Sequence, residues 1–132
     1  MRKMYSKKIL ERFRNPKFVG EISDADSIGE VGNVRCGDIM RIYIKVKNNK
    51  IQDIKFRTYG CVAAIASSDY LCELAKGKTL DKALKITSKD IVKKMGEVPQ
   101  IKIHCSVLAQ NALKKAIEEY REKETKNVQF NS

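Results

Sequence analysis

Apolar and polar residues alternate strictly over residues 40–47, and this alternation predicts a strand with one buried face. Four apolar side chains stand at every second position from Met40 to Val46, separated by charged residues and one tyrosine. Asn48-Asn49 follows at once, and asparagine tolerates the positive φ of a tight hairpin turn. The same alternation returns over residues 53–59. The pattern therefore predicts an antiparallel hairpin whose apolar face needs a cover of helices.

Two further features concern this sheet. Ile51 is out of phase with the apolar face of the return strand, which indicates a β-bulge or a late strand start. Upstream, residues 18–34 carry three glycines among acidic residues. This composition predicts a short strand and then a mobile loop leading to Cys36. We therefore expect a sheet of about three strands.

Helical patterns occur in the sequence both before and after the predicted strands. Near the N-terminus Ser6 can cap a short amphipathic helix, which Asn15-Pro16 ends. After Cys61 a second helix places small and apolar side chains on one face, and Gly77 suits its C-terminal stop.

Three further helices are predicted in the rest of the chain. Thr79 and Ser88 can cap two short helices, each with an aspartate in its first turn. The last helix carries a long apolar stripe from Leu108 to Tyr120. Beyond this stripe, residues 124–132 are polar and have nothing to bury, so we expect this tail to fray.

These elements together predict an α+β fold: a small antiparallel sheet of about three strands, covered on one face by helices, with a long C-terminal helix. At 132 residues the chain is most simply one domain spanning residues 1–132. No apolar run approaches the roughly 20 residues of a membrane span. The basic N-terminus leads into no apolar signal core. We therefore expect a cytoplasmic protein that does not associate with membranes.

The formal net charge of +11 invites a nucleic-acid-binding interpretation. The basic residues are spread along the chain and interleaved with aspartate and glutamate. The sequence contains no helix-turn-helix, RNA-binding strand or zinc-finger motif. A solvated basic surface accounts for the charge better, and we expect no specific nucleic-acid partner.

Three of the four cysteines stand where the chain turns or a helix starts. Cys36 precedes a predicted strand, Cys61 follows one, and Cys105 begins the last helix beside His104, the only histidine. Such positions expose a thiol and favour its thiolate, which bonds metals and attacks sulfur. If the sheet and last helix pack together, these junctions can meet at one end of the domain. Asp38 adds a hard oxygen ligand, which suits a site that releases what it holds. The spacing alone leaves scattered structural cysteines and a metal or cluster site equally open.

Cys72 differs from the other three cysteines. It lies eleven residues after Cys61, so on one continuous helix the two Cα atoms would be about 16 Å apart. Two ligands of one small cluster cannot be that distant. Because Leu71 and Leu74 flank it, we interpret Cys72 as a helix-packing residue.

Several motifs occur in a defined order along the chain. They are Tyr5-Ser6, Asn15-Pro16, Val19-Gly20, Val31-Gly32-Asn33, Arg35-Cys36-Gly37-Asp38, Phe56-Arg57-Thr58-Tyr59-Gly60-Cys61, Ala64-Ile65-Ala66-Ser67-Ser68, Lys76-Gly77-Lys78-Thr79-Leu80 and Lys102-Ile103-His104-Cys105-Ser106-Val107-Leu108-Ala109. On these motifs the chain resembles the U-type iron–sulfur cluster assembly scaffold family, the small proteins similar to IscU and to the N-terminal domain of NifU. The resemblance extends nearly from end to end.

The resemblance implies a scaffold, not an enzyme, on which a [2Fe–2S] cluster is assembled and then transferred to recipient apo-proteins. Sulfur would arrive as persulfide from a cysteine desulfurase. By position, Cys36, Cys61 and Cys105 resemble the cluster thiolates, and Cys105 also resembles the principal persulfide acceptor. Asp38 resembles the residue that ligates the cluster or keeps it labile.

The neighbours of Cys105 carry further implications. His104 resembles an alternative or neighbouring ligand, and its presence favours the IscU-like branch over the zinc-dependent sulfur-transfer branch. Lys102 can support the Cys105 thiolate from outside the ligand set. The family's chaperone-recognition segment, Leu-Pro-Pro-Val-Lys, is Val98-Pro99-Gln100-Ile101-Lys102 here. This departure weighs against dependence on a dedicated Hsp70-type chaperone.

Two other functions stay open beside the scaffold. A zinc-binding sulfur-relay protein is one, because three cysteines with His or Asp also make a tetrahedral zinc site, and zinc could substitute for iron in the isolated protein. A basic nucleic-acid-binding module is the other, supported by the charge alone. The sequence also leaves open whether a cluster lies within one subunit or between the two subunits of a homodimer.

Overall fold

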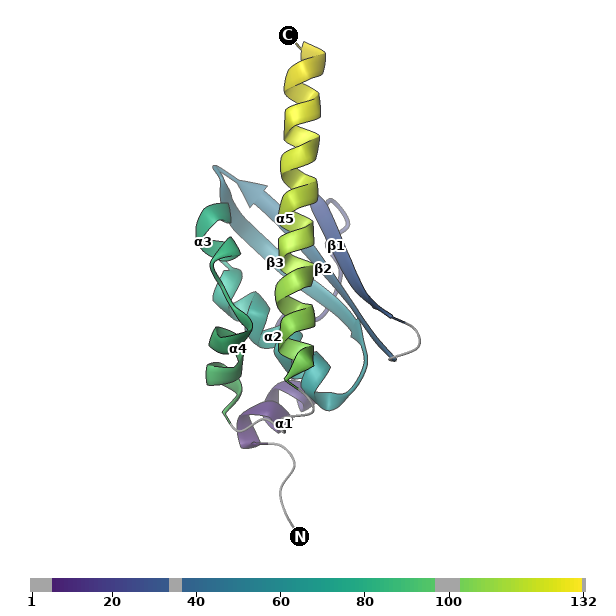
Figure 1. The fold of residues 1–132 in the computed structure, drawn as a ribbon, viewed down its shortest axis with the longest axis vertical. Coiled ribbons are helices and arrows are strands. Elements are labelled where there is room, and N and C mark those ends of the chain that lie inside the picture. The colour runs from purple at the N-terminus through teal and green to yellow at the C-terminus, as the bar shows by residue number, and fades with distance from the viewer. Residues whose placement is uncertain (1–5, 34–36, 97–102, 132) are drawn as a thin grey trace.

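The structure is a computed structural model of the chain, and it describes residues 6–33, 37–96 and 103–131. Figure 1 shows a small sheet with helices packed against it. In chain order the elements are α1 (Lys7–Arg14), β1 (Ser27–Asn33), β2 (Asp38–Lys47), β3 (Lys50–Tyr59), α2 (Val62–Ala75), α3 (Leu80–Leu84), α4 (Ser88–Met95) and α5 (His104–Asn131). The predicted α+β class, with a three-stranded sheet and a long final helix, is confirmed.

The strands are ordered β1-β2-β3, and both neighbouring pairs are antiparallel. Asn48 and Asn49 connect β2 to β3 with φ values of 54° and 62°. These are the left-handed values that a two-residue hairpin turn needs. The predicted hairpin is therefore confirmed, and the choice of two asparagines explains how it turns.

The predicted bulge is also present. Lys45 pairs with Asp53, whereas the next residue, Val46, pairs with Ile51. Gln52 is thus the extra residue of β3, and it is exposed. Because one residue is skipped, Ile51 returns to the buried face and is fully covered.

The prediction for residues 18–34 was wrong in its order. We expected a short strand and then a loop, but the regular strand is the later part, Ser27–Asn33. The earlier part makes only an isolated bridge to β3. There the Phe56 N–H donates to the Phe18 carbonyl at 3.0 Å, and the Gly20 N–H donates to the Phe56 carbonyl at 2.9 Å.

Gly29 explains why β1 was hard to recognise. Glycine is depleted in strands, yet here it allows β1 to pack directly on α5. A Cβ at Gly29 would lie 2.2 Å from the Ala112 carbonyl oxygen and 2.5 Å from the Ala116 nitrogen. The residue that obscures the strand in the sequence is therefore required by its packing.

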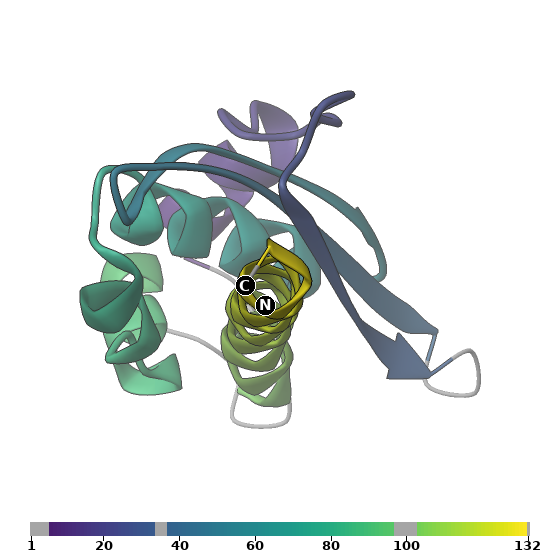
Figure 2. The same cartoon turned by 90° about the horizontal axis from the view of Figure 1, so that it is seen from above.

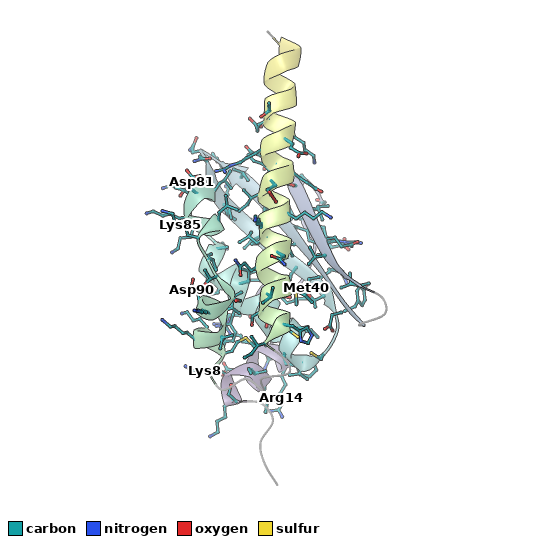
Figure 3. All side chains as sticks on the ribbon, viewed as in Figure 1. Lys8, Arg14, Met40, Asp81, Lys85 and Asp90 are labelled. Carbon is teal, nitrogen blue, oxygen red and sulfur yellow. The ribbon has the colours of Figure 1, made fainter. Side chains whose placement is uncertain are left out.

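Helices α2 and α5 cover one face of the sheet, as the view along α5 in Figure 2 shows. The predicted inward faces of the strands and helices meet there. Fully buried members of this core are Met40, Ile42, Ile44, Ile54, Phe56, Ala64, Leu71, Ala112, Ala116 and Ile117. In Figure 3 Met40 lies in this layer, whereas Asp81, Lys85 and Asp90 project from the outer sides of α3 and α4.

The helix starts follow the predicted capping residues with one exception. Ser6 accepts from the Ile9 N–H at the start of α1, and Thr79 accepts from the Lys82 N–H at the start of α3. Helix α4 is capped by Thr87, not by Ser88 as we predicted. Thr87 takes this role because Asp90 stands three residues later and forms a reciprocal capping box with it. The Thr87 N–H donates to the Asp90 carboxylate at 2.9 Å.

Helix α5 continues to Asn131, so the structure assigns helix within the tail for which the sequence predicts fraying. Figure 1 shows this last part of α5 extending past the edge of the sheet. Within the described residues, no helix is both long and apolar enough to cross a membrane.

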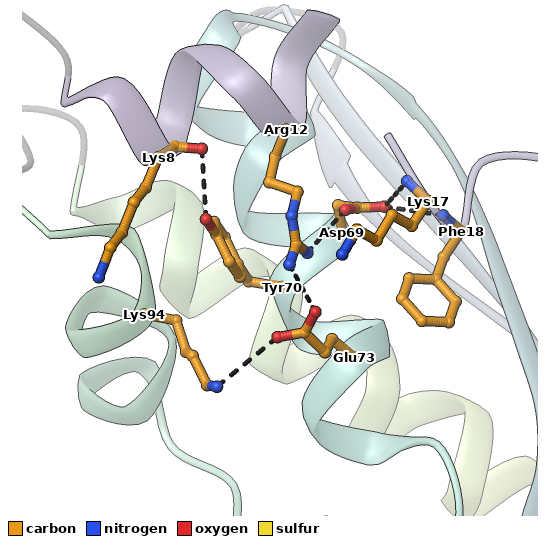
Figure 4. A network of polar contacts seen from close by, with 8 residues as sticks. All are labelled: Lys8, Arg12, Lys17, Phe18, Asp69, Tyr70, Glu73 and Lys94. Atoms are coloured by element: carbon orange, nitrogen blue, oxygen red, sulfur yellow. Dashed lines mark hydrogen bonds and ion pairs between the residues drawn. The ribbon is translucent and has the colours of Figure 1, made fainter. Parts of the chain in front are cut away.

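A buried ion pair attaches α1 to α2 (Figure 4). Arg12 Nη1 donates to Asp69 Oδ2 at 2.9 Å, and its other amino group donates to Glu73 Oε1. The second oxygen of Asp69 accepts from the backbone N–H groups of Lys17 and Phe18, at 2.7 and 2.8 Å. Asp69 is completely buried, and burial of a charge is tolerated when it is paired and hydrogen-bonded in this way. The network holds Lys17 and Phe18, where the chain reaches the edge of the sheet, against α2.

Candidate metal centre

Three side chains with metal-ligating atoms converge at one end of the sheet. They are Asp38, the first residue of β2; Cys61, the residue that precedes α2; and Cys105, in the first turn of α5. Each offers one ligand atom, and these atoms all lie within 4.8 Å of one another. The antiparallel pairing explains the first two, because Ile39 is opposite Tyr59, so the start of β2 lies beside the end of β3.

The distances within this group are short. Cys61 Sγ lies 3.7 Å from Cys105 Sγ. The Cys61 backbone N–H donates to Asp38 Oδ1 at 3.4 Å. On the other side, His104 Nε2 lies 3.4 Å from Asp38 Oδ2 and 3.7 Å from Cys105 Sγ. Among the described residues, His104 is therefore a further side chain of the site, within reach of both a carboxylate and a thiol.

The site is buried on one side and open on the other. Cys105 is completely buried and Asp38 is 6% exposed. Cys61 is half-buried, and the His104 side chain is 52% exposed. Ions or small groups can thus approach from the side of Cys61 and His104, while Cys105 and Asp38 form the floor.

Two of the predicted site residues, Cys36 and Lys102, lie outside the described residues, as does the segment 98–102. Cys72 lies in α2 and is completely buried. Burial raises the pKa of its thiol well above the ordinary value, which opposes formation of a thiolate ligand. The interpretation of Cys72 as a packing residue agrees with this position.

One residue of the site was not recognised as such from the sequence. In the sequence, Gly60 stands out only as part of the motif that ends in Cys61. The structure places its Cα against the carboxylate of Asp38. No local pattern could reveal this contact, because Gly60 follows β3 whereas Asp38 begins β2.

The site defines a class of protein: a small α+β domain with two thiols, a carboxylate and an imidazole gathered at the start of two helices. The family model described as the NifU-like N-terminal domain matches residues 4–127. The chain thus belongs to the family of NifU-like N-terminal domains, which confirms the resemblance to U-type scaffolds.

Individual relatives agree with this assignment. The chain is 54% identical over 123 residues to a protein of Archaeoglobus fulgidus named iron–sulfur cluster assembly scaffold protein IscU 1; the match covers 93% of this chain and 80% of that protein. It is 46% identical over 127 residues to the scaffold protein IscU of Buchnera aphidicola, covering 93% and 98% of the two chains. Among solved structures, a putative scaffold protein for the SUF system from Fervidobacterium islandicum matches with a TM-score of 0.71 at 26% identity, covering 86% of this chain and 96% of that one.

Proposed function

We propose that the chain is a scaffold on which a [2Fe–2S] cluster is assembled and from which the cluster passes to recipient apo-proteins. The observation that carries this proposal is the grouping of Asp38, Cys61 and Cys105 within 4.8 Å. Relatives that match most of the chain are named as iron–sulfur cluster assembly scaffolds, and this supports the same role. We assign Cys36 as the third thiolate from its place in the family motif.

The mixture of ligands suits a cluster that is held temporarily. Thiolates are soft ligands that bind iron–sulfur clusters firmly. A carboxylate is a harder ligand and binds the same iron less firmly. With Asp38 in the fourth position, the cluster has one ligand that a recipient's thiol can replace. The N-terminal ends of α2 and α5 both face this site, and helix N-termini accommodate the negative charge of a thiolate-bound cluster.

Sulfur delivery is assigned to Cys105. Its thiolate attacks the outer sulfur of a persulfide on a cysteine desulfurase; the donor's S–S bond breaks, and the donor cysteine leaves as a thiolate. The sulfur is then bound as persulfide on Cys105, and an external reductant supplies the two electrons that convert it to sulfide. Delivery occurs from the side of His104, since that side of the site is open.

The chain acts in this proposal as a carrier and not as an enzyme. Its partners are a cysteine desulfurase and the recipient apo-proteins, and the cytoplasm stays the predicted compartment. A homodimer that shields the cluster, and a single subunit that holds it alone, are both consistent with three thiolates and one carboxylate.

Anaerobic reconstitution tests the proposal. The reduced protein is incubated with ferrous iron, a cysteine desulfurase and cysteine, then examined by absorption spectroscopy and by analysis of iron and acid-labile sulfide. We expect the charge-transfer bands of a [2Fe–2S] cluster and equal amounts of iron and sulfide. A colourless protein that keeps one zinc ion and never takes up iron would instead support the zinc-binding sulfur relay.

A further inference from the structure

Gly60 stands at a crowded point of the site. A Cβ at this position would lie 2.4 Å from Asp38 Oδ1 and 3.1 Å from Ala64 Cβ. Contacts under 3.0 Å essentially never occur at real Cβ atoms, so a side chain here would have to displace the carboxylate. The φ angle of Gly60 does not lie in the left-handed region that favours glycine. Space, and not backbone conformation, is therefore what requires glycine at this position.

The carboxylate that Gly60 accommodates has contacts at both oxygens. Oδ1 accepts the Cys61 N–H at 3.4 Å, and Oδ2 lies 3.4 Å from His104 Nε2. Asp38 is only 6% exposed, so its side chain has little room to adopt another rotamer. The absence of a side chain at Gly60 thus keeps Asp38 beside the two thiols.

We propose that Gly60 is a positioning residue for Asp38. Because it lacks a side chain, the carboxylate can lie against the chain just before α2, within reach of a metal ion bound by Cys61 and Cys105. The inference rests on the proposed ligand role of Asp38, but it applies to any metal ion at this site. Replacing Gly60 by alanine would force Oδ1 out of the position from which it can reach that ion.

A double-mutant cycle on zinc affinity tests this proposal. Zinc binding to the reduced protein is measured by competition with a chromophoric chelator for the parent, Gly60→Ala, Asp38→Ala and the double variant. Gly60→Ala should weaken zinc binding on the order of tenfold, the effect typical of residues that orient metal ligands. In the Asp38→Ala background the same substitution should have no further effect, since no carboxylate is left to displace. A Gly60→Ala protein that binds zinc like the parent, or an equal loss in both backgrounds, would overturn the proposal.

Stability measurements on the metal-free proteins complete the test. If Gly60→Ala lowers the urea midpoint, the loss should be relieved in the double variant, where alanine at position 38 leaves room for the methyl group. A double variant as unstable as Gly60→Ala alone would contradict the proposal. Gly77→Ala serves as the control, because a Cβ there meets no atom within 4 Å; it should leave zinc affinity unchanged. Zinc binding without cluster assembly would refute the scaffold function and leave this test valid.

Discussion

Cys61 Sγ and Cys105 Sγ lie 3.7 Å apart, although 44 positions separate the two residues in the sequence. Cys61 directly precedes α2, and Cys105 lies in the first turn of α5. The contact exists because both helices cover the same face of the sheet and begin at the same end. The thiol pair is therefore a property of the packed fold, and it gives the site its chemistry.

Cys61 and Cys105 should form a disulfide when the metal-free protein is oxidised. A mild thiol oxidant should join Cys61 to Cys105, since their sulfur atoms need only a small movement to reach the bond length of about 2.05 Å. Peptide mass spectrometry should find the linked peptides, and zinc uptake should be lost until a reductant is added. Cys61→Ser is the control and should show no such link. Full alkylation of both thiols, when the oxidised protein is unfolded in the presence of iodoacetamide, would show that they do not meet in solution.

Cys72→Ala should leave cluster loading unchanged. Cys72 is completely buried in α2, and burial raises the pKa of its thiol, so the native protein should protect it from iodoacetamide. Removing its sulfur should cost about 1 kcal/mol of unfolding free energy, as deletion of one buried methyl-sized group does. Alkylation followed by mass spectrometry and urea unfolding measure the two effects. Loss of cluster loading would mean that Cys72 takes part in the site.

Gly29→Ala should destabilise the fold strongly. The new methyl group would meet backbone atoms of Ala112 and Ala116, which cannot move without shifting α5 as a whole. We expect a loss of roughly 3 kcal/mol, at the upper end for overpacking, measured by urea unfolding. Gly77→Ala is the matched control: its Cβ meets nothing, and only its φ of +84° adds about 1 kcal/mol of strain. Equal losses would contradict the close approach of β1 to α5.

Glu73→Gln should lower stability at neutral pH but not in acid. Burial opposes ionisation of Glu73, yet the hydrogen bond and charge of Arg12, with Lys94 nearby, outweigh it and lower the pKa of Glu73 below its ordinary value of 4.5. A lowered pKa contributes stability that is present above the unfolded-state pKa and is lost as pH falls through the folded-state pKa.

Urea unfolding at several pH values measures this contribution. At pH 7 the free energy of unfolding of the parent should exceed that of Glu73→Gln. The difference should be at most ~1 kcal/mol, because Glu73 is partly exposed. The difference should shrink as pH falls below 4.5 and vanish once pH is below the folded-state pKa of Glu73. Glu118→Gln, an exposed position on α5, should have no effect at any of these pH values. A Glu73 difference that does not depend on pH would contradict the role of its charge.

The strands and helices that follow a regular period could be predicted from the sequence. Alternation over residues 40–47 and the asparagine pair gave the hairpin, and the out-of-phase Ile51 indicated the bulge. Strand β1 was misplaced because Gly29 is selected by its contact with α5, which no local pattern records. The cap of α4 was misplaced by one residue, since Thr87 and Ser88 both suit the role until Asp90 decides between them.

The sequence indicated candidate residues for the site but not how they are arranged. Their places at a turn and at a helix start indicated that Cys61 and Cys105 are reactive. The carboxylate of Asp38 indicated a harder ligand beside them. That these junctions meet depends on strand register and helix packing, which are long-range features. The space that Gly60 leaves for Asp38 is also a long-range feature, because it exists only where the end of β3 lies beside the start of β2.

The most direct test of the account is the rate of cluster transfer from the Asp38→Ala protein. In this variant His104, whose Nε2 lies 3.4 Å from Asp38 Oδ2, can occupy the vacated position with a softer nitrogen ligand. Both proteins are reconstituted with a [2Fe–2S] cluster and mixed anaerobically with an apo-ferredoxin, and transfer is followed by circular dichroism. We expect transfer from Asp38→Ala to be slower on the order of tenfold, an effect of the size seen when the surroundings of a metal site change. Equal transfer rates for the two proteins would contradict the claim that Asp38 makes the cluster temporary.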